Sequence, residues 1–449
     1  MANEVPNFAW EELASHFVYV HANPEAKGVT DLFLRCKPTQ GEDITTFISA
    51  LAREIEQHSA RERGKYLETY TAPALEDVLI DDETIKEISP FFSQLHEELR
   101  TPRWKWDEVP INNPYCRHPQ EAQCSCLIPY DERQARALLR RRVGEITSCD
   151  FFGPNAAGLR SWELLRTLAI HGKMEPIFKL CAHPDNGFKV WWDLSTCLCE
   201  GGNGASFHVY QKAAISFICL NILRQFPETW DSTKGRNEQN DYRLTRMYQH
   251  VVRHTTKTST ASATPCLAHC YFYGIDNLQF SINTRPREPE RWPQLVKKDY
   301  MGNDYMSEDD YPEGLISYED FINFEKAAEY QPHINDVKPV EEILTGKGLP
   351  SELVAEVVDL AEYTPRRRLK VEHNPFHPDN KDDLESYLAE CWAVMIQYDM
   401  LSKEIDENID WVSQLRGCFQ ELLPSLRIMW VPETVRSDNE PVQNVYVIV

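Results

Sequence analysis

The sequence predicts a mainly α-helical, multi-domain protein with a minor β component and a C-terminal helical-hairpin domain. Apolar residues recur at three- and four-residue steps in most of the chain, which is the period of an amphipathic helix. The 449 residues exceed one typical domain of about 100–200 residues. A proline-rich and acidic stretch precedes the C-terminal helical pattern. We therefore expect an N-terminal helical region at 1–128, a central helical domain at 129–283, a linker region at 284–345 and a C-terminal helical domain at 346–449.

The N-terminal region is predicted to contain two helices. Phe47, Leu51 and Ile55 recur at four-residue steps and would share one helix face. A second helix is expected within Asp82–Leu99, where Pro90 limits its length because proline cannot donate the interior hydrogen bond.

The central domain is predicted to be helical with two short strands. The stretch Phe207–Phe226 is apolar on nearly all sides, so we expect a buried central helix there. Lys189–Leu194 and Tyr271–Ile282 are expected to be strands. Further helices are expected at Glu132–Val143, Leu159–His171 and Asp241–His254.

The C-terminal domain has the clearest helical pattern. Pro350 stands where a helix can begin, and an apolar face follows it, formed by Leu353, Val357 and Leu360. Asn380 can cap a second helix. The apolar face of that helix consists of Leu384, Leu388, Cys391 and Met395. Two such helices joined by a proline-containing loop predict an αα-hairpin whose apolar faces need a partner surface.

The segment Gly348–Trp411 resembles part of a known family. It contains LPSEL, HPDN, YLAECW and IDW in this order, which gives the pattern LPxEL…HPxN…YLxxCW…IDW. This pattern is similar to the C-terminal segment of an uncharacterised fungal protein family. The resemblance implies a fungal source, and it implies no activity because none is known for that family.

The residues Leu349–Leu353 are also similar to the start of an F-box, a module that binds a ubiquitin-ligase adaptor. An F-box has three helices, whereas Arg366–Arg368 and the HPxN loop interrupt its apolar pattern here. An ordinary helix start explains the same residues. The candidate protein-binding residues of this domain are Leu349, Pro350, Leu353, Val357 and Trp392.

The chain is strongly acidic, with 47 Lys and Arg against 70 Asp and Glu and a formal net charge of −23. A surface of this charge repels phosphate backbones, so nucleic acid is not expected as the main partner. The most apolar stretch, Ala213–Leu223, is shorter than the about 20 residues that span a bilayer. The opening MANEVPNFAW lacks the features of a secretion signal. We expect a protein of the cytoplasm or nucleus, neither secreted nor membrane-bound, with its 13 cysteines reduced.

A recurrent cysteine and histidine pattern is the main candidate for a metal site. Cys-x-His-Pro followed by Cys-x-Cys occurs twice. The candidate ligands are Cys116, His118, Cys124, Cys126, Cys181, His183, Cys197 and Cys199. Three thiolates and an imidazole suit Zn²⁺, but structural zinc sites space paired ligands by about two to four residues, and Cys-x-Cys is closer than that. Reduced cysteines buried as small apolar residues are the alternative.

Two predicted helices of the central domain have basic faces, which could bind phosphate groups or RNA. Because the whole chain is acidic, we expect these side chains to pair with the protein's own carboxylates. The basic faces consist of Arg133, Arg136, Arg140, Arg141 and Arg142 in one helix and of Arg243, Arg246, His250, Arg253 and His254 in the other.

These observations favour a non-enzymatic protein-interaction or scaffold protein that needs no cofactor. Helix pairs with wide apolar faces and many aromatic residues suit protein partners. No G-x-S-x-G or H-E-x-x-H motif indicates a catalytic set. The alternative is a zinc-binding protein or metal-dependent enzyme that uses the Cys/His clusters, and a second alternative is an F-box-like ubiquitin-ligase adaptor. The sequence specifies no oligomeric state.

Overall fold

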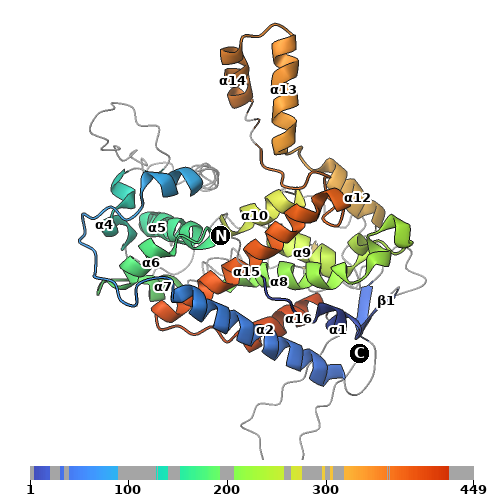
Figure 1. Ribbon diagram of the computed structural model, residues 1–449, viewed down its shortest axis with the longest axis horizontal. Helices are drawn as coiled ribbons and strands as arrows, with labels where there is room; N and C mark the ends of the chain where they lie inside the picture. The colour runs from blue at the N-terminus through green and yellow to red at the C-terminus, as the bar shows by residue number, and fades with distance from the viewer. Residues whose placement is uncertain are drawn as a thin grey trace, which may run out of the picture.

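Helices dominate the structure, which confirms the predicted mainly α-helical fold (Figure 1). The computed structural model describes residues 5–20, 31–34, 40–88, 128, 130–139, 152–192, 207–256, 264–275, 296–298, 304–306, 318–361, 363 and 365–423. No helix within these ranges combines the length and the apolar character that crossing a lipid bilayer requires.

The helices and strands of these ranges have the following bounds. The first helices are α1 (Trp10–Ala14), α2 (Gln40–Arg63), α4 (Ala135–Leu138), α5 (Phe152–Ile170), α6 (Met174–Cys181), α7 (Phe188–Trp192) and α8 (Phe207–Arg224). They are followed by α9 (Arg246–Thr256), α10 (Thr264–Tyr273), α12 (Tyr318–Ala327), α13 (Ile334–Gly346), α14 (Ser351–Leu360), α15 (Lys381–Glu404) and α16 (Trp411–Leu422). Residues 82–88 are also helical, and short 3-10 helices include η6 (Tyr242–Leu244) and η10 (Pro378–Asn380). The strands are β1 (Phe17–Val20), β2 (Asp31–Leu34), β3 (Val296–Lys298) and β4 (Asp304–Met306).

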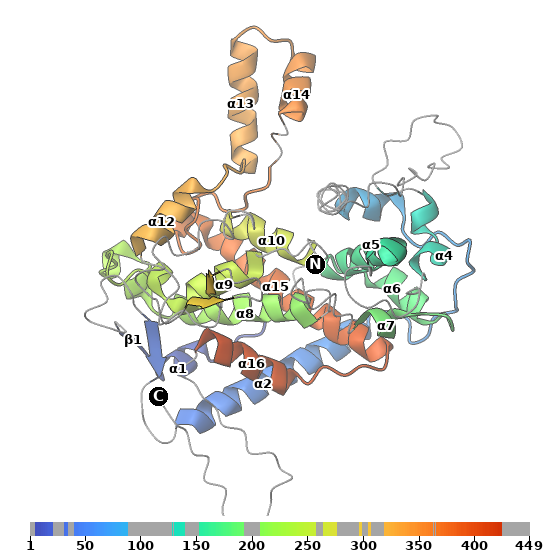
Figure 2. The ribbon, with the colours of Figure 1, turned by 180° about the vertical axis from the view of Figure 1, so that it is seen from behind.

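The core is centred on α8, the helix that the sequence predicts to be buried. Phe217, Leu220 and Leu223 of this helix are fully buried, and α9, α15 and α16 pack around it. In the views of Figure 1 and Figure 2, α2 and α16 lie below α8 and α10 lies above it. Burial of one such side chain stabilises the folded state by about 1.5–3 kcal/mol. A helix that is apolar on all sides is therefore most stable when other helices surround it.

Helices from several of the predicted regions contribute to the same core. The predicted helix at Phe47–Ile55 is part of α2, and Leu51 and Ile55 are fully buried in it. This face of α2 packs against α15 and α16, which belong to the predicted C-terminal domain. One connected set of buried apolar residues therefore extends from α1 to the end of α16. The domain boundaries themselves stay a prediction.

The two strands predicted in the central domain are wrong over the residues described. Residues 188–192 form α7, and residues 264–273 form α10, which is followed by Gly274 with a left-handed φ of 67°. A short apolar run is compatible with a strand or a buried helix, so periodicity alone does not separate the two. In α7, helical spacing places Phe188 and Trp192 on one buried face, which decides for the helix.

The observed β component consists of two antiparallel strand pairs elsewhere in the chain. β1 pairs with β2, with Phe17 opposite Leu34, and β3 pairs with β4, with Val296 opposite Met306. The second pair lies in the stretch 284–345 that the sequence predicts as a linker region. The same stretch contains α12 and most of α13, and Phe321 of α12 is fully buried.

The C-terminal helical hairpin is present, but its helices are α13 and α14 rather than α14 and α15. α15 runs through the core and contacts α2, α5, α6 and α8 instead. Its buried residues occupy nearly every side of the helix between Leu384 and Ser402, so it needs more covering surface than one hairpin partner offers. α14 has a narrow apolar face, which α13 partly covers.

Asn380 precedes α15 at the predicted position but does not cap the helix. Its side chain accepts a hydrogen bond from the backbone N–H of Val371 (2.8 Å) and donates to the carbonyls of Val371 (2.7 Å) and Asn374 (2.8 Å). The asparagine of the HPxN motif therefore holds the loop between α14 and α15, and it is fully buried in this role.

Candidate protein-interaction site

The hairpin of α13 and α14 projects from the helical body, as both Figure 1 and Figure 2 show. α13 has no buried residue along its whole length. Among the described residues, the large apolar side chains that are exposed include five of this hairpin, Ile334, Ile343, Leu353, Val357 and Leu360. The hairpin, residues 334–360, is therefore the candidate interaction site.

Local sequence features explain why the chain forms a hairpin here. His333 and Asp336 make a capping box at the start of α13: the ring Nδ1 of His333 accepts from the backbone N–H of Asn335 (3.1 Å), and Asp336 Oδ2 accepts from the backbone N–H of His333 (2.8 Å). The turn after α13 places Gly348 at a φ of 91°, which side chains other than glycine rarely adopt. Pro350 then precedes α14, where its missing N–H costs no helix hydrogen bond.

The exposed apolar residues of α14 lie at helical spacing on one side. Leu353 is 48% exposed, Val357 is 39% exposed and Leu360 is 79% exposed, whereas Val354 on the other side is buried at 4%. The sequence predicts that Leu353, Val357 and Leu360 share a face, and the structure places that face outward. We call these three residues the α14 stripe.

The hairpin is acidic around this stripe. Residues 334–360 contain six acidic residues, Asp336, Glu341, Glu342, Glu352, Glu356 and Asp359, against two lysines, Lys338 and Lys347. Glu352 and Glu356 are exposed in the same helix as the stripe. The surface therefore combines apolar contact area with negative charge.

Arg367 joins the two chain segments at the base of the hairpin. Its guanidinium donates to Asp336 Oδ2 (2.9 Å) at the start of α13 and to the carbonyls of Gln331 (3.0 Å), Leu369 (3.0 Å) and Lys370 (3.1 Å). The side chain is 8% exposed, so these are shielded, charge-assisted hydrogen bonds. The arginine run that interrupts the F-box pattern thus has a structural role at the base of the hairpin.

Arg368 connects the same base to the helical body. Its guanidinium pairs with both carboxylate oxygens of Glu390 in α15, and its backbone N–H donates to the carbonyl of Tyr271 in α10 (3.1 Å). A bidentate pair between guanidinium and carboxylate fixes direction as well as distance. The hairpin base is therefore attached to two helices of the body.

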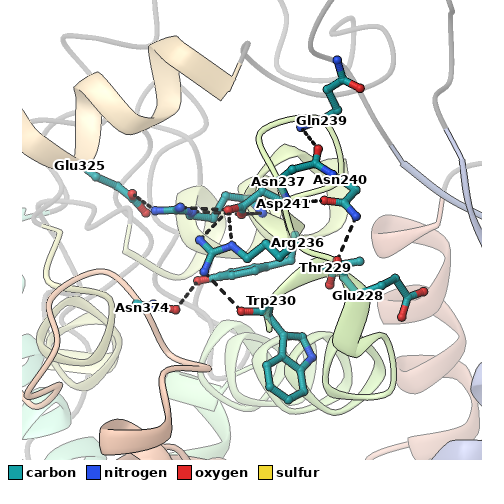
Figure 3. A network of polar contacts seen from close by, with 12 residues as sticks. Glu228, Thr229, Trp230, Arg236, Asn237, Gln239, Asn240, Asp241, Glu325 and Asn374 are labelled. Atoms are coloured by element: carbon teal, nitrogen blue, oxygen red, sulfur yellow. Dashed lines mark hydrogen bonds and ion pairs between the residues drawn. The ribbon is translucent and has the colours of Figure 1, made fainter. Parts of the chain in front are cut away.

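A buried ionic network attaches the preceding helix, α12 (Figure 3). Asp241 accepts from Arg236 Nε (2.7 Å) and from Arg243 Nε (3.0 Å), and Arg243 Nη1 donates to Glu325 of α12 (2.9 Å). Asp241 and Glu325 are almost fully buried. Burial raises the pKa of Glu325 to about 8, against the opposing effect of Arg243.

We predict that Arg367→Ala loosens the base of the hairpin and leaves the core intact. Loss of hydrogen bonds to a charged group, each contributing about 1.5–3 kcal/mol, frees the two segments that Arg367 joins. Amide hydrogen exchange at positions 366 and 367 and in the first turn of α13 should become about tenfold faster or more, while α8 keeps its protection. Lys338→Ala, on the exposed side of α13, is the control and should change neither region.

The predicted protein-binding residues separate into two groups in the structure. Pro350, Leu353 and Val357 are exposed on the hairpin, and Leu349 is half-buried at its turn. Trp392 lies in the core instead, fully buried, with its Nε1–H donating to His58 Nδ1 (3.0 Å). Its place in a helix with apolar residues on nearly every side explains why it is covered. Trp392 is therefore not part of the exposed surface.

The predicted Cys/His clusters lie mostly outside the described residues, where Cys116, His118, Cys124, Cys126, Cys197 and Cys199 fall. Cys181 is partly buried, and burial raises the pKa of its thiol well above the usual range, which favours the thiol over the thiolate that binds zinc. His183 Nδ1 accepts from the backbone N–H of Asp185 (3.0 Å). Zinc binding by these clusters stays a prediction.

Three arginines of the two predicted basic faces pair with carboxylates of the protein, whereas Arg140, Arg141 and Arg142 lie outside the described residues. Arg133 donates to Asp82, Arg136 lies within 3.6 Å of Glu76, and Arg243 pairs with Asp241 and Glu325. Arg133 is buried at 2% exposure, so its pairing with a carboxylate also satisfies a charge inside the protein.

Sequence reasoning missed two features of the candidate site. The HIND segment at His333–Asp336 is a capping signal, which marks the true start of the hairpin at α13. The arginine run 366–368 indicates only a polar segment in the sequence. Its partners are distant in the chain, so its structural role was not predictable. The first feature was visible in the sequence, whereas the second needed the fold.

Comparison with known proteins supports a single assignment. No curated protein and no solved structure matches this chain. A family model described as "Gramillins biosynthetic cluster protein GRA5" matches residues 11–429, a range that includes the hairpin and the core helices. This match is consistent with the resemblance to an uncharacterised fungal family. The chain belongs to the family of Gramillins biosynthetic cluster protein GRA5.

Proposed function

We propose that this protein is a non-enzymatic interaction protein whose α13–α14 hairpin docks a basic, amphipathic segment of a partner protein. The observation that carries the proposal is the α14 stripe, which projects from the body with no covering element in the described part of the chain. The family description adds a context, because it names a biosynthetic cluster. The partner is then another protein of that cluster, in the cytoplasm or the nucleus.

The chemistry of the hairpin defines the partner. Leu353, Val357 and Leu360 offer apolar contacts at the spacing that an amphipathic helix recognises. Glu352 and Glu356 beside them favour lysine and arginine on the partner and disfavour a second copy of the same acidic hairpin. The base held by Arg367 and Arg368 limits the conformational entropy lost on binding.

Pairwise binding with purified proteins encoded by the same cluster tests this proposal. The double variant Leu353→Asp/Val357→Asp should raise the Kd for the partner by roughly 30-fold or more. This is the change expected when a central apolar contact of about 2 kcal/mol is lost. Binding of the unmodified protein should also weaken as the salt concentration rises, because the charges of both partners are screened. Isothermal titration calorimetry measures both effects.

The matched control is Leu67→Asp. Leu67 is 64% exposed and follows α2, outside the hairpin, so its replacement exchanges an exposed leucine for an aspartate on another part of the chain. Circular dichroism establishes that all variants remain folded. Equal loss of binding in the control and the hairpin variant, or no binding to any cluster protein, would contradict the proposal.

A ubiquitin-ligase adaptor is the second candidate partner. The F-box-like residues Leu349–Leu353 form the turn and start of α14, where Pro350 and Leu353 are exposed. Purified adaptor protein should then bind the unmodified chain and lose binding on Leu353→Asp. Absence of binding to the adaptor removes this candidate and leaves the first proposal in place.

A further inference from the structure

Two histidines and a glutamate converge at one point between α9 and α16, away from the hairpin. His250 and His254 are one helical turn apart in α9, and their rings stack at 5.5 Å between centroids with 15° between the planes. Glu421 of α16 lies opposite, with Oε2 at 3.5 Å from His250 Nε2. One ligand atom from each residue lies within 4.8 Å of the other two.

A second observation concerns the orientation of the glutamate. Gln211 of α8 donates from Nε2 to Glu421 Oε1 (2.7 Å), which leaves Oε2 directed at His250. Neither Oε2 of Glu421 nor Nε2 of His250 has a hydrogen-bond partner among the described residues, although both atoms are inaccessible to solvent. Buried polar atoms of this kind call for a ligand or a proton between them.

We propose that His250, His254 and Glu421 form a site for one divalent transition-metal ion, with Zn²⁺ as the expected occupant. Two imidazoles and one carboxylate are a ligand set that zinc uses where a fourth position stays open for water or a substrate. In a tetrahedral site with bonds of about 2.0–2.2 Å, ligand atoms are about 3.3 Å apart. The separation of 3.5 Å between His250 and Glu421 is close to that value, and the ligand atom of His254 lies within 4.8 Å of both.

The surrounding helices hold the ligands in place. Val251 and Val252 are fully buried on the other side of α9, and α8, α9 and α16 contact one another. Gln211 acts as a positioning residue, because it fixes the carboxylate through the oxygen that the metal does not use. The side chains of His250 and Glu421 are 25% and 35% exposed, so the site lies near the protein surface although the two ligand atoms are covered.

The competing occupant is a proton. Protonated His250 would pair with Glu421 at the observed distance and leave His254 outside the pair. Arg246 and Arg253 belong to the same helix and disfavour a cation, whereas Glu421 favours it. A shared proton would involve only His250 and Glu421, whereas a metal ion would use all three side chains that converge here. The convergence of three ligand atoms therefore favours the metal.

Metal titration of the full-length, untagged protein after removal of metals with a chelator tests the proposal. The protein should bind one equivalent of Co²⁺ or Zn²⁺ that His254→Ala and Glu421→Gln both lose. Gln211→Ala should keep the site but weaken the affinity by about 10–100-fold, as loss of a ligand-orienting hydrogen bond does. Zn²⁺ should raise the Tm of the unmodified protein more than that of His254→Ala.

His183→Ala is the matched control, because it removes a histidine from one of the predicted Cys/His clusters. This variant should keep the metal bound at His250, His254 and Glu421 and lose only metal bound by that cluster. Its Co²⁺ spectrum should keep the features of nitrogen and oxygen ligation. Thiolate ligation gives intense near-ultraviolet bands and would identify a cysteine site. If His254→Ala and Glu421→Gln bind as much metal as the unmodified protein, the proposed centre does not exist.

Discussion

Replacement of Arg243 by methionine is expected to lower the free energy of unfolding by about 3–5 kcal/mol. Arg243 donates to Asp241 at 3.0 and 2.9 Å and to Glu325 at 2.9 Å, and both carboxylates are almost fully buried. Methionine fills part of the volume but supplies no charge. Asp241 then keeps only Arg236 as a charged partner, and the buried carboxyl group of Glu325 loses the guanidinium that it contacts. Chemical denaturation followed by circular dichroism measures the loss.

The effect of Arg243→Met should grow as the pH rises. Burial raises the pKa of Glu325 to about 8, above its value of about 4.5 in an unfolded chain. The folded state therefore binds a proton more tightly than the unfolded state, and this contribution to stability is present at low pH and is lost as the pH rises through 8. Without Arg243 the ionised form loses its partner, so the destabilisation should be larger at alkaline than at mildly acidic pH.

Glu325→Gln is the control for this interpretation. It removes the charge of Glu325 and leaves the pairs of Arg243 and Arg236 with Asp241. We expect a smaller loss of stability than for Arg243→Met and a weaker dependence on pH between about 5 and 8. A loss for Arg243→Met that does not change with pH would show that Glu325 does not titrate as its burial implies.

Replacement of Trp392 by alanine is expected to cost about 3–5 kcal/mol of the free energy of unfolding. The indole is fully buried, and its centroid lies 5.5 Å from Phe8 and 5.6 Å from Phe217. These contacts join the N-terminal segment, α8 and α15, so the cavity opens where three parts of the chain meet. Loss of the Nε1–H donor also leaves His58 Nδ1 without that partner.

Trp392→Phe separates packing from hydrogen bonding at this position. It keeps most of the ring volume and removes the bond to His58, so we expect a loss of about 1–3 kcal/mol, smaller than for alanine. Thermal unfolding gives both values. A protein–protein contact at Trp392 would instead leave the stability of the isolated chain nearly unchanged, as surface substitutions do.

The helical class and several elements could be predicted from local sequence. The helices at Phe47–Ile55, Leu159–His171 and Phe207–Phe226 are present because their apolar periodicity continues over several turns. The strands expected at 189–194 and 271–282 failed because short apolar runs fit either state. In those cases burial against α8 and its neighbours determines whether the segment is a helix or a strand. Local sequence does not show which residues will be buried against one another.

The candidate interaction surface was partly predictable. The common face of Leu353, Val357 and Leu360 follows from spacing within one helix, whereas its exposure depends on which helix pairs with α14. The histidine pair of α9 was visible as two histidines four residues apart. Glu421, the third residue of the proposed site, lies far along the chain from His254, so the sequence indicates only the histidine pair.

The sequence by itself determined the helical class, the buried central helix, the acidic surface and the apolar face of α14. Each of these follows from composition or from periodicity within a few turns. Only the tertiary structure decided that α15 is a core helix, that α13 is the partner of α14, and that His250, His254 and Glu421 meet. The physical reason is that burial and side-chain pairing depend on residues distant in the chain, which local spacing does not encode.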